Sequence, residues 1–355
     1  MEKQVFKINE NNIKEVKTKR SSNIELLRIF MAICVLVIHF LPSFQANIPF
    51  LHGCVGAFAM ISGYYLVEKK DNLRFLKFIP TIVFLYVINL SLVLIFNFSS
   101  DYKIFSTRLE WIKFLQLGTG PWWYIYAVFI LYIFTPFFNA GLKVTGKKVS
   151  LILIISFWLT FQIQALLLYS YRPFTYIHNA LPTLFFSYLL GGWLKLFGQN
   201  VFNYKKTIWI STIVYFLVQL GFHLLYVFLY PQKDDWFDLS KNNGSLLSFG
   251  ASFFLFASFK IMPMKNYKFI DFLGSISLFI FALHMSTIWF SKFFFHLFGW
   301  KYNSDGMYSL ASAITFLISL LIYWPYKKYM QGINFLTNKF VQTNFYKKLV
   351  VDTQL

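Results

Sequence analysis

The chain has 355 residues and a formal net charge of +19, yet only 13% of its residues are charged and 57% are apolar. A soluble fold usually carries about 25% charged residues to keep its surface hydrated. This chain therefore cannot cover a water-facing globule and must be surrounded largely by lipid, which excludes a disordered chain, a secreted disulfide scaffold and a soluble enzyme. Its two cysteines, Cys34 and Cys54, lie in apolar runs and indicate neither a disulfide framework nor a cysteine-based metal site.

In chain order, ten apolar stretches each approach the roughly 20 residues that a helix needs to cross hydrocarbon. They are Ile24–Leu41, Ile48–Val67, Phe75–Phe98, Trp123–Leu142, Val149–Tyr169, Ile177–Leu196, Thr207–Tyr230, Ser245–Ile261, Leu273–Leu297 and Tyr308–Tyr329. They are too long for barrel strands, in which polar and apolar residues alternate. The pattern predicts an all-α, polytopic membrane protein with about ten transmembrane helices.

The basic residues alternate with these stretches. If the N-terminus is cytoplasmic, 24 of the 33 Lys and Arg residues lie on the cytoplasmic side and seven on the outer side. This bias is the usual determinant of membrane topology, and it explains the positive charge without nucleic acid as a partner. We expect a polar cytoplasmic tail over 1–22, a transmembrane domain over 23–330 and a cytoplasmic C-terminal tail over 331–355.

Arg28 and His39 are the strongest site candidates, because ionisable groups inside a span are costly and by default functional. They are eleven residues apart in the first stretch, so they share one side of the helix and are separated by roughly 16 Å along its axis. Arginine binds a permanent anion, and histidine can accept and return a proton near neutral pH. The structural alternative is that Arg28 extends toward the membrane interface and pairs with Glu25, while His39 has a hydrogen-bonded structural role.

Other polar groups carry weaker signals. His284 lies well inside the ninth stretch, where a packing role is as plausible as a site role. Ser62 belongs to a small-residue segment typical of close helix packing. Trp123 and Tyr124 open the fourth stretch, where an aromatic belt is a sufficient explanation. The sequence offers no carboxylate cluster and no pair of histidines at metal-ligand spacing, so no metal site is expected.

Four segments in chain order resemble the acyltransferase 3 family of integral membrane acyltransferases, over about residues 22–330. They are Asn23-Ile-Glu-Leu-Leu-Arg28 followed by His39, Phe58-Ala-Met-Ile-Ser-Gly63-Tyr-Tyr-Leu, Pro121-Trp-Trp-Tyr124, and Leu273-Gly-Ser-Ile-Ser277 through His284. The third also has Tyr132 and Pro136 downstream. The fourth has Phe281 where the family more often has tyrosine, so no hydroxyl relay can be placed there.

The resemblance implies an enzyme of the polysaccharide O-acetyltransferase type. Such proteins move an acyl group, usually acetyl, from cytoplasmic acyl-coenzyme A to a hydroxyl of a cell-surface or lipid-linked glycan. His39 would be the acid/base or acyl-relay residue and Arg28 a donor-binding residue. Arg74 and Lys77, which would also bind the donor, occupy a segment that is often arginine-rich in the family, and lysine lacks the planar donor fork for bidentate phosphate binding. Glu25, Ser62, Trp123, Tyr124 and His284 would support the site or the acceptor.

The implied setting is a multi-pass protein of a bacterial plasma membrane, with lipid, acyl-coenzyme A and a glycan as partners and no permanently bound cofactor. Glycan-synthesis machinery is a further possible partner. Two other classes fit ten spans with polar groups: an exporter of polysaccharide or lipid-linked glycan that performs no chemistry, and a structural subunit of a glycan-synthesis complex. Transfer of labelled acetyl from acetyl-coenzyme A to glycan would discriminate between them.

Overall fold

The structure is a computed structural model, and every regular element in the part that it describes is helical. It describes residues 21–40, 49–69, 74–99, 123–168, 176–229, 246–299 and 305–341. These ranges contain α1 (Ser22–Phe40), α3 (Gly53–Leu66), α4 (Arg74–Ser99), α6 (Trp123–Leu168), α7 (Tyr176–Leu196), α8 (Lys205–Leu229), α10 (Leu246–Ile261), α11 (Lys268–Leu297) and α12 (Asp305–Val341). Two short 3₁₀ helices, η2 (Pro49–His52) and η4 (Gln199–Asn203), precede α3 and α8. The predicted all-α class is confirmed for this part of the chain.

The length and composition of the apolar helices indicate a membrane protein. Four described stretches are long and apolar enough to cross a bilayer, namely Ser22–His39, Phe78–Ile95, Trp123–Phe161 and Ser309–Leu336. Two shorter apolar helices cover Gly53–Leu66 and Leu247–Ile261. The described residues of each of the ten predicted stretches are helical, whereas ten crossings stay a prediction. At the C-terminal end, α12 continues past residue 330, where the sequence predicted a tail, to Val341.

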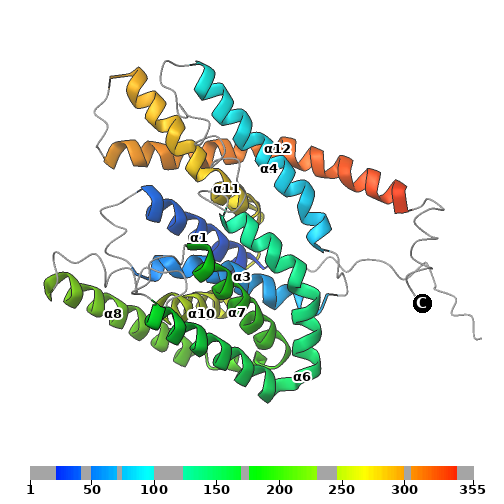
Figure 1. The fold of residues 1–355 in the computed structure, drawn as a ribbon, viewed down its shortest axis with the longest axis vertical. Coiled ribbons are helices and arrows are strands. Elements are labelled where there is room, and N and C mark those ends of the chain that lie inside the picture. Colours follow the sequence, from blue (N-terminus) through cyan, green and yellow to red (C-terminus); the bar gives the residue numbers. More distant parts are fainter. Residues whose placement is uncertain are drawn as a thin grey trace, which may run out of the picture.

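The fourth and fifth predicted stretches lie within one element, α6, which is two helices joined at Gly146 (Figure 1). Gly146 has φ of 70° and ψ of −179°. A positive φ of this kind is readily adopted only by glycine, because a Cβ atom would clash with the backbone. The glycine therefore turns the chain where the sequence predicted a loop between two spans.

The two halves of α6 run along α7 in opposite directions. In the first half, Phe134 packs on Phe185, with ring centres 5.6 Å apart, as one of several contacts that advance together along both helices. In the second half, the Lys147 carbonyl accepts a hydrogen bond from the Trp193 indole, and further along Phe161 packs on Phe186. In this second half, contacts that advance along α6 retreat along α7, so the two halves of α6 run in opposite directions and form an antiparallel hairpin.

Helix α1 packs on α11 and on α3 and α10 (Figure 1), and its buried residues belong to two hydrophobic cores. Its residues Leu27 and Met31 join the core built mainly with α3, α6, α7 and α10. Its residues Ala32 and Leu36 join the core built mainly with α4, α11 and α12. Because one stripe of α1 is buried on each side, its polar residues are held in the middle of the molecule.

Helices α1 and α11 pack in parallel. Ser22 at the start of α1 hydrogen-bonds Asp271 at the start of α11, and His39 near the end of α1 contacts His284 further along α11. A Cβ at Gly274 would lie 2.2 Å from the Glu25 carboxylate, so the absence of a side chain there permits this close approach. The pairing places the polar residues of α1 directly against α11.

Candidate functional site

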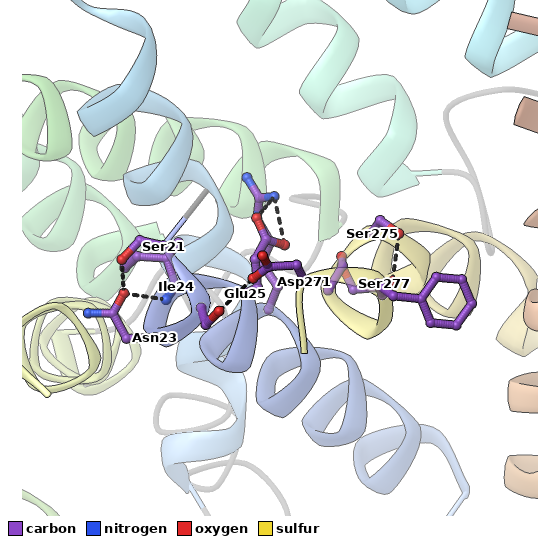
Figure 2. A network of polar contacts seen from close by, with 11 residues as sticks. Ser21, Asn23, Ile24, Glu25, Asp271, Ser275 and Ser277 are labelled. Atoms are coloured by element: carbon purple, nitrogen blue, oxygen red, sulfur yellow. Dashed lines mark hydrogen bonds and ion pairs between the residues drawn. The ribbon is translucent and has the colours of Figure 1, made fainter. Parts of the chain in front are cut away.

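The start of α1 is fixed by polar contacts with α11 (Figure 2) and with the segment that precedes α11. The Ser22 hydroxyl donates to the Asp271 carboxylate at 2.7 Å and accepts from the Tyr267 backbone N–H at 2.8 Å. The Asn23 amide donates to the Lys260 carbonyl at 3.1 Å, which ties α1 to the end of α10. These contacts determine the axial position of α1, and therefore of the candidate residues along it.

Arg28 is paired with Glu25 one turn earlier, as the sequence allowed. One guanidinium nitrogen, Nη1, lies 2.9 Å from Glu25 Oε1 and 3.2 Å from Oε2. The Glu25 side chain is 5% exposed and that of Arg28 is 32% exposed. The carboxylate is thus buried against α11, while the guanidinium is partly exposed.

His39 meets His284 at the other end of α1. The two ring centres are 4.7 Å apart and the rings are inclined by 36°. His284 is buried, and its Nδ1 lies 2.6 Å from the carbonyl oxygen of Phe281. Since a carbonyl only accepts hydrogen bonds, Nδ1 carries a proton, and in the neutral ring Nε2 is the basic nitrogen. The structure thereby brings together two imidazoles from the first and ninth predicted spans.

An aromatic wall continues from this histidine pair. Phe281 packs edge-on against His284 and lies 4.0 Å, centre to centre, from Tyr124. Tyr124 also contacts Trp123 and Phe58, and Phe58 supplies the carbonyl that accepts the Ser62 hydroxyl hydrogen bond at 3.1 Å. Trp123 and Tyr124 therefore adjoin the histidines through Phe281, whereas the Ser62 hydroxyl is satisfied within its own helix.

We call Glu25, Arg28, Tyr124, His39 and His284 together the α1–α11 site. Tyr124 adjoins the histidine end, because it packs on the phenylalanine beside His284. Two predicted donor residues are not part of this description: Arg74 and Lys77 lie in the first turn of α4, and their side chains are outside the described residues. Among the described residues, no group of three metal-ligating side chains occurs.

Several buried polar groups near His284 in the chain or in contact with its helix were not predicted from the sequence. The Ser286 hydroxyl hydrogen-bonds the Asn89 side-chain oxygen of α4, and Asn89 donates to the Leu85 carbonyl at 2.9 Å. Thr287 donates to the His284 carbonyl at 2.8 Å and contacts Thr315 of α12. Small hydroxyl residues inside apolar stretches are common helix-packing residues, so the sequence alone does not mark them as part of a site.

Comparison with known proteins gives one positive result. A family model described as an acyltransferase domain, the acyltransferase 3 model, matches residues 21–324. This range includes every residue of the α1–α11 site. It begins just before α1 and ends within α12. Searches of curated proteins and of solved structures gave no match.

Proposed function

Because the chain belongs to the acyltransferase 3 family of membrane acyltransferases, we propose that it acetylates a glycan. The donor is cytoplasmic acetyl-coenzyme A, and the acceptor is a hydroxyl of a cell-surface or lipid-linked polysaccharide. The observation that carries this proposal is the contact between His39 and His284 in the middle of the helical domain, 4.7 Å between ring centres. Two imidazoles in that environment suit proton transfer, and a purely structural role would not require both.

In this proposal, His39 is the general base. It takes the proton of the acceptor hydroxyl as the hydroxyl oxygen attacks the thioester carbonyl carbon. The C–S bond then breaks, and the proton passes to the departing thiolate, which leaves as coenzyme A. His284 positions His39 and is itself oriented by the Phe281 carbonyl. Tyr124 and Trp123 form the wall against which the acyl group or acceptor lies.

Arg28 binds the donor near the start of α1. Its partner Glu25 holds the guanidinium in place through an ion pair, and the Glu25 side chain packs closely against Gly274 of α11. Arg74 and Lys77, at the first turn of α4, would add donor-side charge. The distance along α1 between Arg28 and His39, roughly 16 Å, suits a donor with an anionic head and a reactive end far from it.

The proposal includes ten crossings of a bacterial plasma membrane with both termini in the cytoplasm. The directions of the packed helices support it. The parallel pair α1 and α11 contains the first and ninth predicted spans, which must run the same way if crossings alternate. The α6 hairpin supplies the reversal required between the fourth and fifth.

The decisive experiment measures transfer of radiolabelled acetyl from acetyl-coenzyme A to glycan in membranes containing the protein. We expect label on glycan with the wild type and a loss of about 100-fold to 10,000-fold in the His39→Ala variant, the range for loss of a general base. The control is His223→Ala on α8, a helix that packs on α10. Glycan exported without label, or equal labelling by His39→Ala and wild type, would favour the exporter.

A further inference from the structure

Two lysines converge on one tyrosine where α3, α7 and α10 end. The Lys260 ammonium lies 4.9 Å from the centre of the Tyr64 ring, and the Lys195 ammonium lies 5.6 Å from it. Lys260 also lies 5.8 Å from the centre of the Tyr65 ring. Both lysines occupy the last turns of their helices, where the helix dipole favours a cation. The dipole accounts for a cation on each helix, but it does not require the two cations to share a ring.

The charges in this cluster do not cancel. Lys195 is paired with Glu68, 3.2 Å away, and the Glu68 side chain is 56% exposed. In the described part of the chain, no carboxylate lies within ion-pair distance of Lys260. Ammonium groups that approach the same ring repel each other and have lost part of their hydration. A doubly charged anion between them would offset both costs.

The tyrosine beneath the lysines is held rigidly. Tyr64 is buried and packs on Phe256, with ring centres 5.3 Å apart. Its hydroxyl donates to the Gln199 side-chain oxygen of η4 at 3.1 Å. A fixed ring limits the positions that the two flexible lysines adopt, so less freedom is lost when they bind a ligand.

The cluster lies at the same end of the molecule as Arg28. Asn23, five residues before Arg28 on α1, hydrogen-bonds the Lys260 backbone carbonyl at 3.1 Å. Tyr65, which neighbours Tyr64 in α3, also contacts Lys260. Arg28, Lys260 and Lys195 therefore lie at one end of the molecule, on the first half of α1 and the last turns of α10 and α7, with His39 at the opposite end of α1.

We propose that Lys195, Lys260 and Tyr64 form a phosphate-binding site that holds the nucleotide part of the acyl donor. The inference rests on the proposed function for the identity of that donor. The nucleotide end of coenzyme A carries several phosphate oxygens, which suit two ammonium groups. Its long arm then extends along α1 toward the histidine pair. The two lysines fix the donor head, whereas Arg28 binds closer to the reaction.

The test uses adenosine 3′,5′-bisphosphate, a phosphate-bearing fragment of coenzyme A, and the full-length protein in nanodiscs of phosphatidylcholine. Calorimetry should show that Lys260→Gln and Lys195→Gln weaken binding by roughly tenfold to a hundredfold, the range for losing a hydrogen bond to a charged group. Lys260→Arg should retain most of the affinity. Lys205→Gln, which removes an exposed charge at the start of α8, is the matched control and should bind like the wild type.

Three results would overturn the site. The first is no bisphosphate binding by the wild type, and the second is equal weakening by Lys260→Gln and Lys205→Gln. The third is that Lys260→Gln leaves bisphosphate binding unchanged and lowers only the amount of phosphatidylglycerol that the protein retains from nanodiscs of mixed lipids. The last would assign the lysines to a lipid headgroup. Acetyl transfer is measured separately. A protein that binds the bisphosphate through Lys260 but labels no glycan would keep this site and reject the proposed reaction. Labelling with unchanged bisphosphate binding in the lysine variants would do the reverse.

Discussion

The contact between His39 and His284 is more informative than either residue alone. An imidazole in an apolar helix is often a hydrogen-bonded packing residue, and neither histidine alone distinguishes that role from catalysis. In the structure their rings are in contact, and the Phe281 carbonyl fixes one nitrogen of His284 as a donor. The remaining nitrogen of His284 is then a base beside His39, so the pair can hold or pass one proton.

Replacing His284 with phenylalanine should separate positioning from packing. The ring volume stays, but both nitrogens are lost, so we expect a lower kcat with the donor KM unchanged. The decrease should be smaller than in His39→Ala, because the base itself remains. Steady-state kinetics with acetyl-coenzyme A measure both constants. A rise in KM at constant kcat would instead indicate that His284 contributes to donor binding.

Arg28→Lys tests the donor role of the guanidinium. A lysine keeps the positive charge but loses the planar set of donors that can hold Glu25 and a second anion together. We expect the donor KM to rise by about tenfold, equivalent to one hydrogen bond to a charged group, and the acceptor KM to stay constant. Kinetics with each substrate varied in turn give the two values, and equal changes in both would contradict this placement.

At the scale of whole helices, close approach depends on glycine. A Cβ at Gly191 of α7 would lie 2.1 Å from the Met60 carbonyl oxygen of α3. A Cβ at Gly63 would lie 1.9 Å from the Tyr188 carbonyl oxygen of α7. Both obstacles are backbone atoms, which cannot rotate away, so either substitution would push α3 and α7 apart.

Gly191→Ala should therefore destabilise the helix pair by about 1 to 3 kcal/mol, the usual cost of overpacking. The matched control is Gly221→Ala on α8, where an added Cβ meets nothing within 4 Å. Thermal unfolding of the two variants in one detergent provides the comparison. A melting temperature equal to that of the control would show that α3 and α7 are further apart than described.

For the molecule as a whole, topology decides whether a cytoplasmic donor can reach the site. Green fluorescent protein inserted at Lys147, beside the α6 turn, or fused to the C-terminus should be fluorescent. Alkaline phosphatase inserted within residues 231–244, a predicted outer loop, should be active. These outcomes follow from the distribution of basic residues and from the reversal at Gly146. Phosphatase activity at Lys147 would place the α6 turn on the outer side and contradict the predicted topology.

The helical class, the helix positions and the family resemblance were accessible from the sequence, because each depends on local composition and spacing. Apolar runs require helices in lipid. All four quoted segments lie within the range that the family model matches. The Glu25–Arg28 pair was equally predictable, since residues three apart lie on one helix face.

Only the tertiary structure decided which of these residues meet. His39 and His284 are 245 residues apart in the chain, and their contact depends on α1 packing in parallel with α11. The convergence of Lys195 and Lys260 on Tyr64 likewise requires three helices to end at one place. Periodicity within a helix determines which face a side chain occupies, but it carries no information about the helix opposite. That choice depends on glycine-permitted approach and on buried polar contacts between distant segments.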